Sequence, residues 1–338
     1  MAQDSKAPNY AILFNPSQNE TTAPHKGARG AGDLNDGLAY VFTGQSVMAV
    51  RVALATGRPL LVRGEPGSGK SSLAPRVARA LGWRLYTQVV TSRTQARDLL
   101  WTVDAVRRLS DAQNPNEKVG EEFRYRDPGV LWWAIHPVTA AQRGAPKETP
   151  LDAKDEAHDP RDPEIGGSPD TPAVILIDEI DKAEPDFPND LLVPLGTYRF
   201  PVPGLEEPIK AAVPPLVIIT SNGERELPLA FRRRCIDLKL PEPNSARLIE
   251  VATKHFGPKD DKLFKRIADA TMQVRDEHKS KRLRPPSIAE FLDAILAFRQ
   301  LHELQQLDGA IMDDQALLDD IERLTLRKTG EAPPLSKT

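Results

Sequence analysis

The stretch "LLVRGEPGSGKSSLA", residues 60–74, decides what fold to expect. An apolar run leads into a glycine-rich segment that ends in Lys-Ser, and small and apolar residues follow. Residues 64–71 fit the phosphate-binding loop pattern, in which glycines let backbone N–H groups turn around phosphate oxygens. The match lies between a predicted strand and a predicted helix, whose positive N-terminal end favours an anion. Pro75 should remove a hydrogen-bond donor from an early turn of that helix.

This loop predicts a nucleotide and a metal ion. Lys70 would reach the β- and γ-phosphates, and Ser71 would bind Mg²⁺. The expected cofactors are therefore ATP and Mg²⁺. The residues expected to hold them from this loop are Gly64, Glu65, Pro66, Gly67, Ser68, Gly69, Lys70, Ser71 and Ser72.

Two further apolar runs end in polar residues suited to hydrolysis. In "VILIDEID", residues 174–181, Asp178 would hold Mg²⁺ through water and Glu179 would polarise the attacking water. Alone, an apolar strand ending in Asp-Glu is more often a capped strand end, but the phosphate loop favours the catalytic interpretation. After "PLVIIT", residues 215–220, Asn222 could bond the same water or the γ-phosphate.

A basic triplet follows in "AFRRRC", residues 230–235. Two interpretations stay open for it. The arginines could form a solvated or nucleic-acid-facing patch. They could also stabilise charge on a transferring phosphoryl group, including from a neighbouring subunit.

Composition excludes several classes of protein. The 338 residues carry a net charge of −3, so the chain as a whole is not built to attract nucleic acid. The single cysteine, Cys235, rules out an internal disulfide and disfavours a cysteine-based zinc site. There is no run of 18 apolar residues and no signal-peptide core, so we expect a soluble, cytoplasmic protein without a membrane partner.

The pattern of apolar runs predicts an open α/β sheet. Short, continuous apolar runs suit parallel strands that are covered on both faces, and helical segments separate them. The run at 235–240 alternates instead and should lie at a sheet edge. The predicted strands are residues 59–63, 86–90, 173–178, 215–220 and 235–240.

The texture changes near residue 242, after which only helices are expected. Three of them should cover residues 245–256, 261–275 and 313–327. Another should begin at the capping box formed by Ser287 and Glu290. The expected domains are a flexible N-terminal arm (1–36), an α/β phosphate-loop domain (37–241) with insertions at about 91–135 and 139–172, a small all-α lid domain (242–327) and a flexible tail (328–338).

Two expectations concern the insertions. Trp101, Trp132 and Trp133 should serve packing rather than stacking on nucleic acid, because aromatics chiefly supply buried area. Residues 141–170 are charged, rich in Pro and Gly and without periodicity. We therefore expect that deleting them leaves folding intact.

Taken in order, these segments resemble the AAA+ ATPases, and within them the MoxR-like branch. "GEPGSGKSSLA" resembles Walker A, "VILIDEID" Walker B, "IITSN" sensor 1 and "LPLAFRRRC" the arginine-finger segment. The resemblance covers roughly residues 38–327 and implies an αβα domain with a five-stranded parallel sheet, followed by a helical lid. It also implies a ring, usually a hexamer, with ATP between subunits.

The resemblance carries roles onto particular residues. Asn222 would be sensor 1, and Arg234 would be the finger, with Arg233 as the second candidate. Arg284 would be sensor 2, although Lys281 and Arg282 compete and "RPPS" departs from the MoxR-like pattern. The 91–135 insertion would engage partners. Tyr40 could approach the adenine or anchor the N-terminal arm, and both interpretations stay open.

The resulting hypothesis is an ATP-hydrolysing ring that remodels a protein client in the manner of a chaperone. MoxR-like proteins often act on von Willebrand factor A-domain partners. One alternative is a GTPase resembling the McrB branch. A second is a nucleic-acid-associated motor, suggested by "FRRRC" and "KSKRLR" but disfavoured by the net charge. A third is a nucleotide-gated scaffold with little hydrolysis.

Overall fold

The computed structural model describes residues 10–16, 39–113, 120–148, 150–153, 155–308 and 313–328. Apart from residues 10–16 and Lys328, the expected N-terminal arm and C-terminal tail lie outside the described residues. The chain packs as two compact units. Among the described residues, the first comprises 10–16, 42–63 and 74–239, and the second comprises 39–41, 64–73 and 240–328.

The first unit contains a five-stranded sheet of parallel strands in the order β2-β5-β8-β1-β9. The strands are β1 (Leu60–Arg63), β2 (Arg84–Val89), β5 (Ala173–Asp178), β8 (Leu216–Ser221) and β9 (Ile236–Lys239). All five predicted strands are confirmed, with small differences at their ends. The alternating strand, β9, lies at an edge of the sheet as its pattern predicts.

Both faces of this sheet are covered. On one face, Leu61, Ile175 and Ile219 belong to a buried cluster that includes Trp132. Their neighbours along the strands point to the other face, and there Val62 is buried as well. This double burial explains why the strands read as continuous apolar runs rather than as alternating patterns.

The helices of the first unit are mostly short. They are α1 (Tyr10–Leu13), α2 (Gly44–Thr56), α3 (Leu73–Leu81), α4 (Ala105–Gln113), α5 (Val130–Ile135), α6 (Pro137–Ala141), α7 (Phe187–Asp190), α8 (Leu192–Thr197) and α9 (Leu229–Arg232). The longest, α2, begins at a capping box between Thr43 and Ser46 and ends at Gly57, whose φ of 66° is left-handed. Pro75 removes no helical bond, because α3 begins only at Leu73 and its first turn has no intrahelical acceptors for N–H groups.

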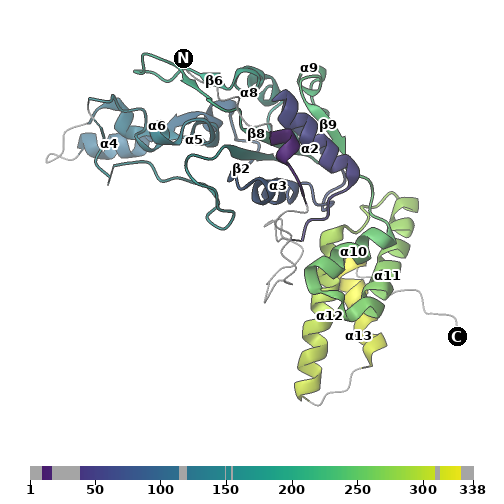
Figure 1. Ribbon diagram of the computed structural model, residues 1–338. Coiled ribbons are helices and arrows are strands. Elements are labelled where there is room, and N and C mark those ends of the chain that lie inside the picture. The colour runs from purple at the N-terminus through teal and green to yellow at the C-terminus, as the bar shows by residue number, and fades with distance from the viewer. Residues whose placement is uncertain are drawn as a thin grey trace. The chain divides into compact units, whose positions relative to one another are not determined.

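Smaller elements complete this unit. Two-stranded ribbons pair β3 (Trp101–Val103) with β4 (Arg126–Pro128), and β6 (Arg199–Phe200) with β7 (Ile209–Lys210). Single 3₁₀ turns cover η1 (Ala96–Leu99), η2 (Glu122–Tyr125) and η3 (Ile180–Lys182). Figure 1 shows α4, α5 and α6 beyond one end of the sheet and α9 with β9 at the other. Trp132 and Trp133 are buried in the core, which confirms their predicted packing role.

The second insertion is part of the folded core, contrary to the expectation from its composition. Leu151 and Ile165 are buried, at 6% and 7% exposure. The N–H of Asp162 donates to the carbonyl of Leu85 in β2 over 2.9 Å. Gly167 packs so closely that a Cβ there would lie 2.6 Å from the backbone nitrogen of Arg84. Residues of this segment therefore belong to the core, which contradicts the reason for expecting that deletion of residues 141–170 leaves folding intact.

The helices of the second unit are α10 (Ser245–Phe256), α11 (Asp261–Ser280), α12 (Ile288–Asp308) and α13 (Asp314–Ile321), with a 3₁₀ turn η4 (Pro258–Asp260) and a π-helical turn η5 (Glu322–Arg327). Phe264 of α11 and Phe291 of α12 are fully buried in its core, and Val41 joins them there. The predicted capping box is confirmed: the Ser287 N–H donates to Glu290 Oε2 over 2.6 Å, and the Glu290 N–H donates to Ser287 Oγ over 3.3 Å.

Among the described residues, none of these helices combines the length and apolar character needed to cross a bilayer.

Candidate functional site

The glycine-rich loop begins directly after β1, at Gly64, and packs with the second unit. Gly67 and Gly69 have φ values of 69° and 86°, a region that side chains with a Cβ rarely adopt. Gly67 has a second constraint, since a Cβ there would lie 2.4 Å from the Cβ of Ser287. Both the backbone conformation and the close packing therefore require glycine at this position.

Lys70 directs its cation into this loop. Its side chain is 5% exposed, and its ammonium donates to the carbonyl oxygens of Gly64 over 3.0 Å and Glu65 over 2.7 Å. Burying an ammonium group without an acceptor would cost roughly several kcal/mol of folding free energy. These carbonyls therefore stabilise the Lys70 ammonium. The loop thus holds a buried positive charge against its own backbone.

The serine that precedes the lysine by two residues has an unsatisfied hydroxyl. Ser68 Oγ is buried and has no hydrogen-bond partner among the described residues. Leaving such a group unpaired costs about 1–3 kcal/mol, so an orphaned hydroxyl here indicates a place for a ligand oxygen. Together with Lys70 and the two left-handed glycines, Ser68 makes the loop fit a polyphosphate. The ring of Tyr40 borders it, because a Cβ on Gly69 would lie 3.7 Å from Tyr40 Cε2.

Glu65 differs from the other loop residues, because its carboxylate is bound by an arginine of α11. Arg275 Nη2 donates to Glu65 Oε2 over 2.7 Å, and Arg275 is 1% exposed. The sequence does not single out Arg275, which is the last residue of the helix predicted over residues 261–275. Arg284, the residue proposed from the family resemblance, is exposed, and its carbonyl oxygen lies 2.8 Å from His278 Nδ1.

In the first unit, Thr220 near the end of β8 links Asp178 and Glu179 at the end of β5. Thr220 Oγ1 donates to Asp178 Oδ1 over 2.5 Å and accepts the backbone N–H of Glu179 over 2.9 Å. Thr220 is fully buried, so this hydroxyl has a fixed environment. Glu179 itself has a φ of 60°, an uncommon left-handed conformation that turns the chain sharply after the strand. The sequence gives no hint of this role, since Thr220 and Ser221 are two ordinary polar residues at the end of an apolar strand.

The Glu179 carboxylate lies between an amide and an ammonium. Oε1 accepts a hydrogen bond from Asn222 Nδ2 over 3.1 Å, and Oε2 accepts one from Lys182 Nζ over 2.6 Å. This hydrogen bond to Glu179 raises the pKa of Lys182. Asp181 is buried and accepts the backbone N–H groups of Asn222 and Glu224 over 3.2 and 2.9 Å, which fixes the loop after β8.

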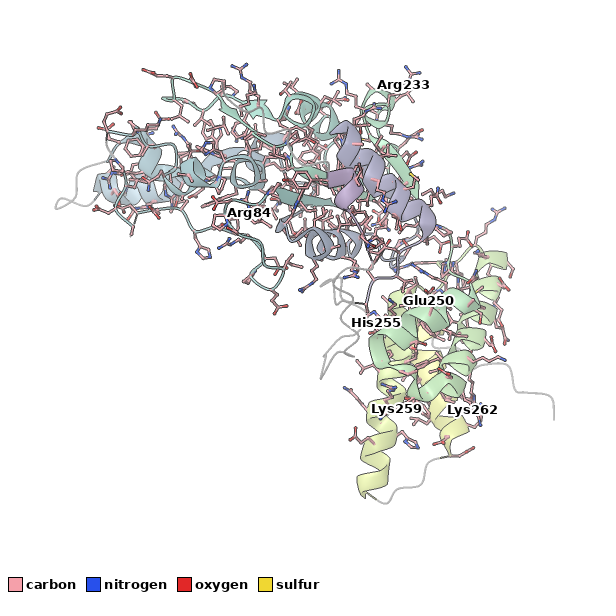
Figure 2. All side chains as sticks on the ribbon, in the orientation of Figure 1. Arg84, Arg233, Glu250, His255, Lys259 and Lys262 are labelled. Carbon is pink, nitrogen blue, oxygen red and sulfur yellow. The ribbon has the colours of Figure 1, made fainter. Side chains whose placement is uncertain are left out.

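The two candidate finger arginines lie at the other end of the same sheet, where strands begin. Arg233 and Arg234 are exposed, just after α9, and Figure 2 labels Arg233 on the outside of this unit. Arg58, which precedes β1, donates from Nε to the carbonyl of Arg234 over 3.1 Å and also binds the carbonyl of Arg233. Arg58 therefore fixes their backbone while leaving the guanidinium groups of Arg233 and Arg234 at the surface.

The described residues contain no group of three or more His, Cys, Asp or Glu side chains that could hold a metal ion alone. Mg²⁺ in phosphate sites usually binds through one or two protein oxygens, with substrate phosphates and water completing its octahedron. The carboxylate of Asp178 and the hydroxyl of Ser71 are donors of this kind. Each of these two oxygens therefore has donor chemistry that suits Mg²⁺.

Comparison with known protein families gives one match. The family described as "AAA domain (dynein-related subfamily)" matches residues 59–235, just over half of the chain. No curated protein matches the chain.

Several solved structures are similar to the chain over most of its length, at low sequence identity. The Thermotoga maritima RuvB Holliday junction branch migration motor is 14% identical, with a TM-score of 0.43, and the match covers 82% of this chain and 66% of RuvB. A point mutant of that protein is 16% identical, with a TM-score of 0.45, and the match covers 84% of this chain and 71% of the mutant. A provisionally assigned ATPase from Cytophaga hutchinsonii gives 14% identity and a TM-score of 0.40, with 86% and 82% covered. The chain thus spans about two thirds of the RuvB motor.

Proposed function

The chain belongs to the dynein-related subfamily of AAA domains, and from this premise we propose that it hydrolyses ATP with Mg²⁺ and uses the energy to remodel a protein client. β1 and β8 pair in parallel and end at the same edge of the sheet, and the phosphate loop begins at the residue after β1. In open α/β sheets, ligands bind at the carboxyl ends of the strands.

The phosphate loop would supply binding. Lys70 would exchange the loop carbonyls for phosphate oxygens, and Ser68 and the backbone N–H groups would donate to them. Ser71 and Asp178 would hold Mg²⁺, which when bound neutralises charge on the phosphates. Gly67 and Gly69 already hold left-handed conformations in the loop.

Hydrolysis would depend on the second group of residues. Glu179 would orient a water molecule and accept its proton, and Asn222 would hold the carboxylate in the required direction. Thr220 would keep Asp178 and Glu179 in fixed relation, so that one carboxylate serves the metal and the other serves the water.

The observation that carries this proposal is the pair of side-chain contacts to Glu179. A carboxylate that merely capped a strand end would bond neighbouring backbone N–H groups. The Glu179 oxygens instead accept hydrogen bonds from Asn222 and Lys182. That arrangement leaves the carboxylate 29% exposed, accessible to a water molecule and oriented from two sides.

A ring assembly, hexameric as in MoxR-like proteins, is the finer part of the proposal. Its support is the exposure of Arg233 and Arg234 on a backbone fixed by Arg58, because an arginine presented at the surface can complete a neighbour's site. The proposed client is a protein, for which a von Willebrand factor A-domain partner is the first candidate to test.

A nucleotide-gated scaffold with little hydrolysis is the second candidate. The ion pair between Lys182 and Glu179, 2.6 Å long, favours it, because a neutralised carboxylate is a weaker base. The two functions differ in turnover rather than in nucleotide binding.

The test is Mg-ATP turnover per subunit over a wide range of protein concentration, with GTP as a parallel substrate. For an ATPase with sites shared between subunits, we expect specific activity to rise with concentration and then level off. Lys70→Ala should abolish ATP binding and serves as the control for contaminating activity. ATP binding without turnover at any concentration would favour the scaffold, and faster turnover of GTP would overturn the choice of ATP.

A further inference from the structure

A carboxylate inside a phosphate-binding loop should weaken the binding of phosphate. Glu65 is the second residue of the loop pattern and lies directly after Gly64, whose carbonyl binds Lys70. A negative charge there would repel a polyphosphate and would also attract the cation that should bind it. The loop therefore needs a reason to tolerate this residue.

The structure supplies a neutralising cation from the helical unit. Arg275, in the C-terminal half of α11, donates from Nη2 to Glu65 Oε2 over 2.7 Å. Its Nη1 donates to the carbonyl of Pro286 over 2.5 Å, and Glu242 Oε2 lies 3.9 Å from Nη2. Glu242 is in turn paired with Lys279. Two acidic and two basic side chains thus form one cluster, in which only Arg275 is almost fully buried.

Burial makes this guanidinium costly to hold without a partner. An arginine that is 1% exposed has given up its water, and a buried charge must be paired to be stable. Glu65 is the carboxylate closest to it in this cluster. The Glu65 carboxylate is consequently bound to α11, while the Lys70 ammonium donates to the backbone carbonyls of Gly64 and Glu65.

We propose that Arg275 is a positioning residue for nucleotide binding, which neutralises Glu65 and draws its carboxylate out of the path of the phosphates. This inference rests on the proposed function, because it takes the polyanion bound by the loop to be a nucleoside triphosphate. It assigns the lid a part in binding that does not require contact between Arg275 and the nucleotide.

A charge-neutralising role of Arg275 differs from a packing role in what it requires of Glu65. Arg275 also supports Pro286, and the next residue, Ser287, packs against Gly67. A purely structural arginine would act through that contact and would be needed whether or not Glu65 is charged. A neutralising arginine is needed only while Glu65 is charged.

The experiment is a double-mutant cycle on the full chain, with the affinity for Mg-AMPPNP measured by calorimetry. Arg275→Met should weaken binding at least about tenfold, because Glu65 then faces the phosphates uncompensated; tenfold corresponds to about 1.4 kcal/mol. Glu65→Gln should bind about threefold more tightly than the wild type. The double variant should recover to within about threefold of the wild type. Arg299→Met, which removes a different lid arginine paired with Asp260, is the matched control and should bind normally.

Each outcome decides between the alternatives. A double variant as weak as Arg275→Met would overturn the proposal, since the loss would then be independent of the Glu65 charge. Unchanged affinity in Arg275→Met would overturn it as well. If Arg275→Met does not fold, Arg275→Lys takes its place: affinity within about threefold supports neutralisation, and a tenfold loss contradicts it. Failure of the folded wild type to bind any nucleotide would instead remove the proposed function.

Discussion

The side-chain amide of Asn222 donates to the carboxylate of Glu179 over 3.1 Å, from the loop after one strand to the turn after its neighbour in the sheet. β5 and β8 are parallel partners, so their carboxyl ends coincide and residues 43 positions apart in the chain meet there. This contact places a hydrogen-bond donor on the proposed base without neutralising it. The other oxygen of Glu179 carries the ion pair with Lys182.

Replacing Glu179 by Gln should separate binding from hydrolysis. Glutamine keeps an oxygen that can accept from Asn222 but cannot take a proton from water. We expect turnover to fall by about 10²-fold or more, the usual contribution of a positioned base, with ATP affinity little changed. Steady-state turnover and equilibrium ATP binding on the same preparation would show this. Turnover close to that of the wild type would remove Glu179 as the base.

Thr220 gives a subtler test of the same site. Thr220→Val keeps the shape but removes the hydroxyl that serves both Asp178 and the Glu179 N–H. Leaving a buried N–H unpaired should lower the free energy of unfolding by about 1–3 kcal/mol, and turnover should fall more than ATP affinity. Thr220→Ser retains the hydroxyl and should stay near the wild type in both. Equal loss in the serine variant would point to packing rather than hydrogen bonding.

Most of the sheet could be predicted because each strand is marked by its own short run of apolar residues. Residues such as Leu61 and Ile219 are buried on strands covered from both sides, which leaves an uninterrupted apolar run in the sequence. The insertion could not be predicted in the same way. Leu151 and Ile165 are isolated apolar residues in a charged segment, and no periodicity indicates that they reach the core.

The insertion therefore leads to a prediction about stability. Ile165→Ala should lower the free energy of unfolding by about 2–5 kcal/mol, because it leaves a cavity in a packed site. Val138→Ala, at a position 69% exposed, should change it by less than about 0.5 kcal/mol. Deleting residues 141–170 should give a destabilised or insoluble protein. Chemical denaturation measures the two substitutions, and a fully stable deletion variant would show that the segment is dispensable.

The candidate site likewise contains residues that a local pattern identifies and residues that it does not. Lys70 and Asp178 belong to short motifs whose spacing reflects one loop and one strand end, so the sequence alone identifies them. Thr220 and Arg275 act through partners 42 and 210 positions away, and each looks ordinary among its neighbours. Contacts of that kind depend on strand register and helix packing, which no local pattern encodes.

Arg234 offers the test of whether the site is shared between subunits. Its guanidinium is exposed, and Arg58 holds its backbone, so Arg234→Ala should leave the fold and ATP binding intact but reduce turnover by about 10³-fold, as loss of an arginine finger does. If Arg234 acts on a neighbour, mixing Arg234→Ala with Glu179→Gln should restore activity. An intact base in one subunit would then meet an intact finger from the next. Arg233→Ala, treated in the same way, identifies which arginine is the finger. Two inactive variants that stay inactive together, although they assemble, would place Arg234 outside any shared site.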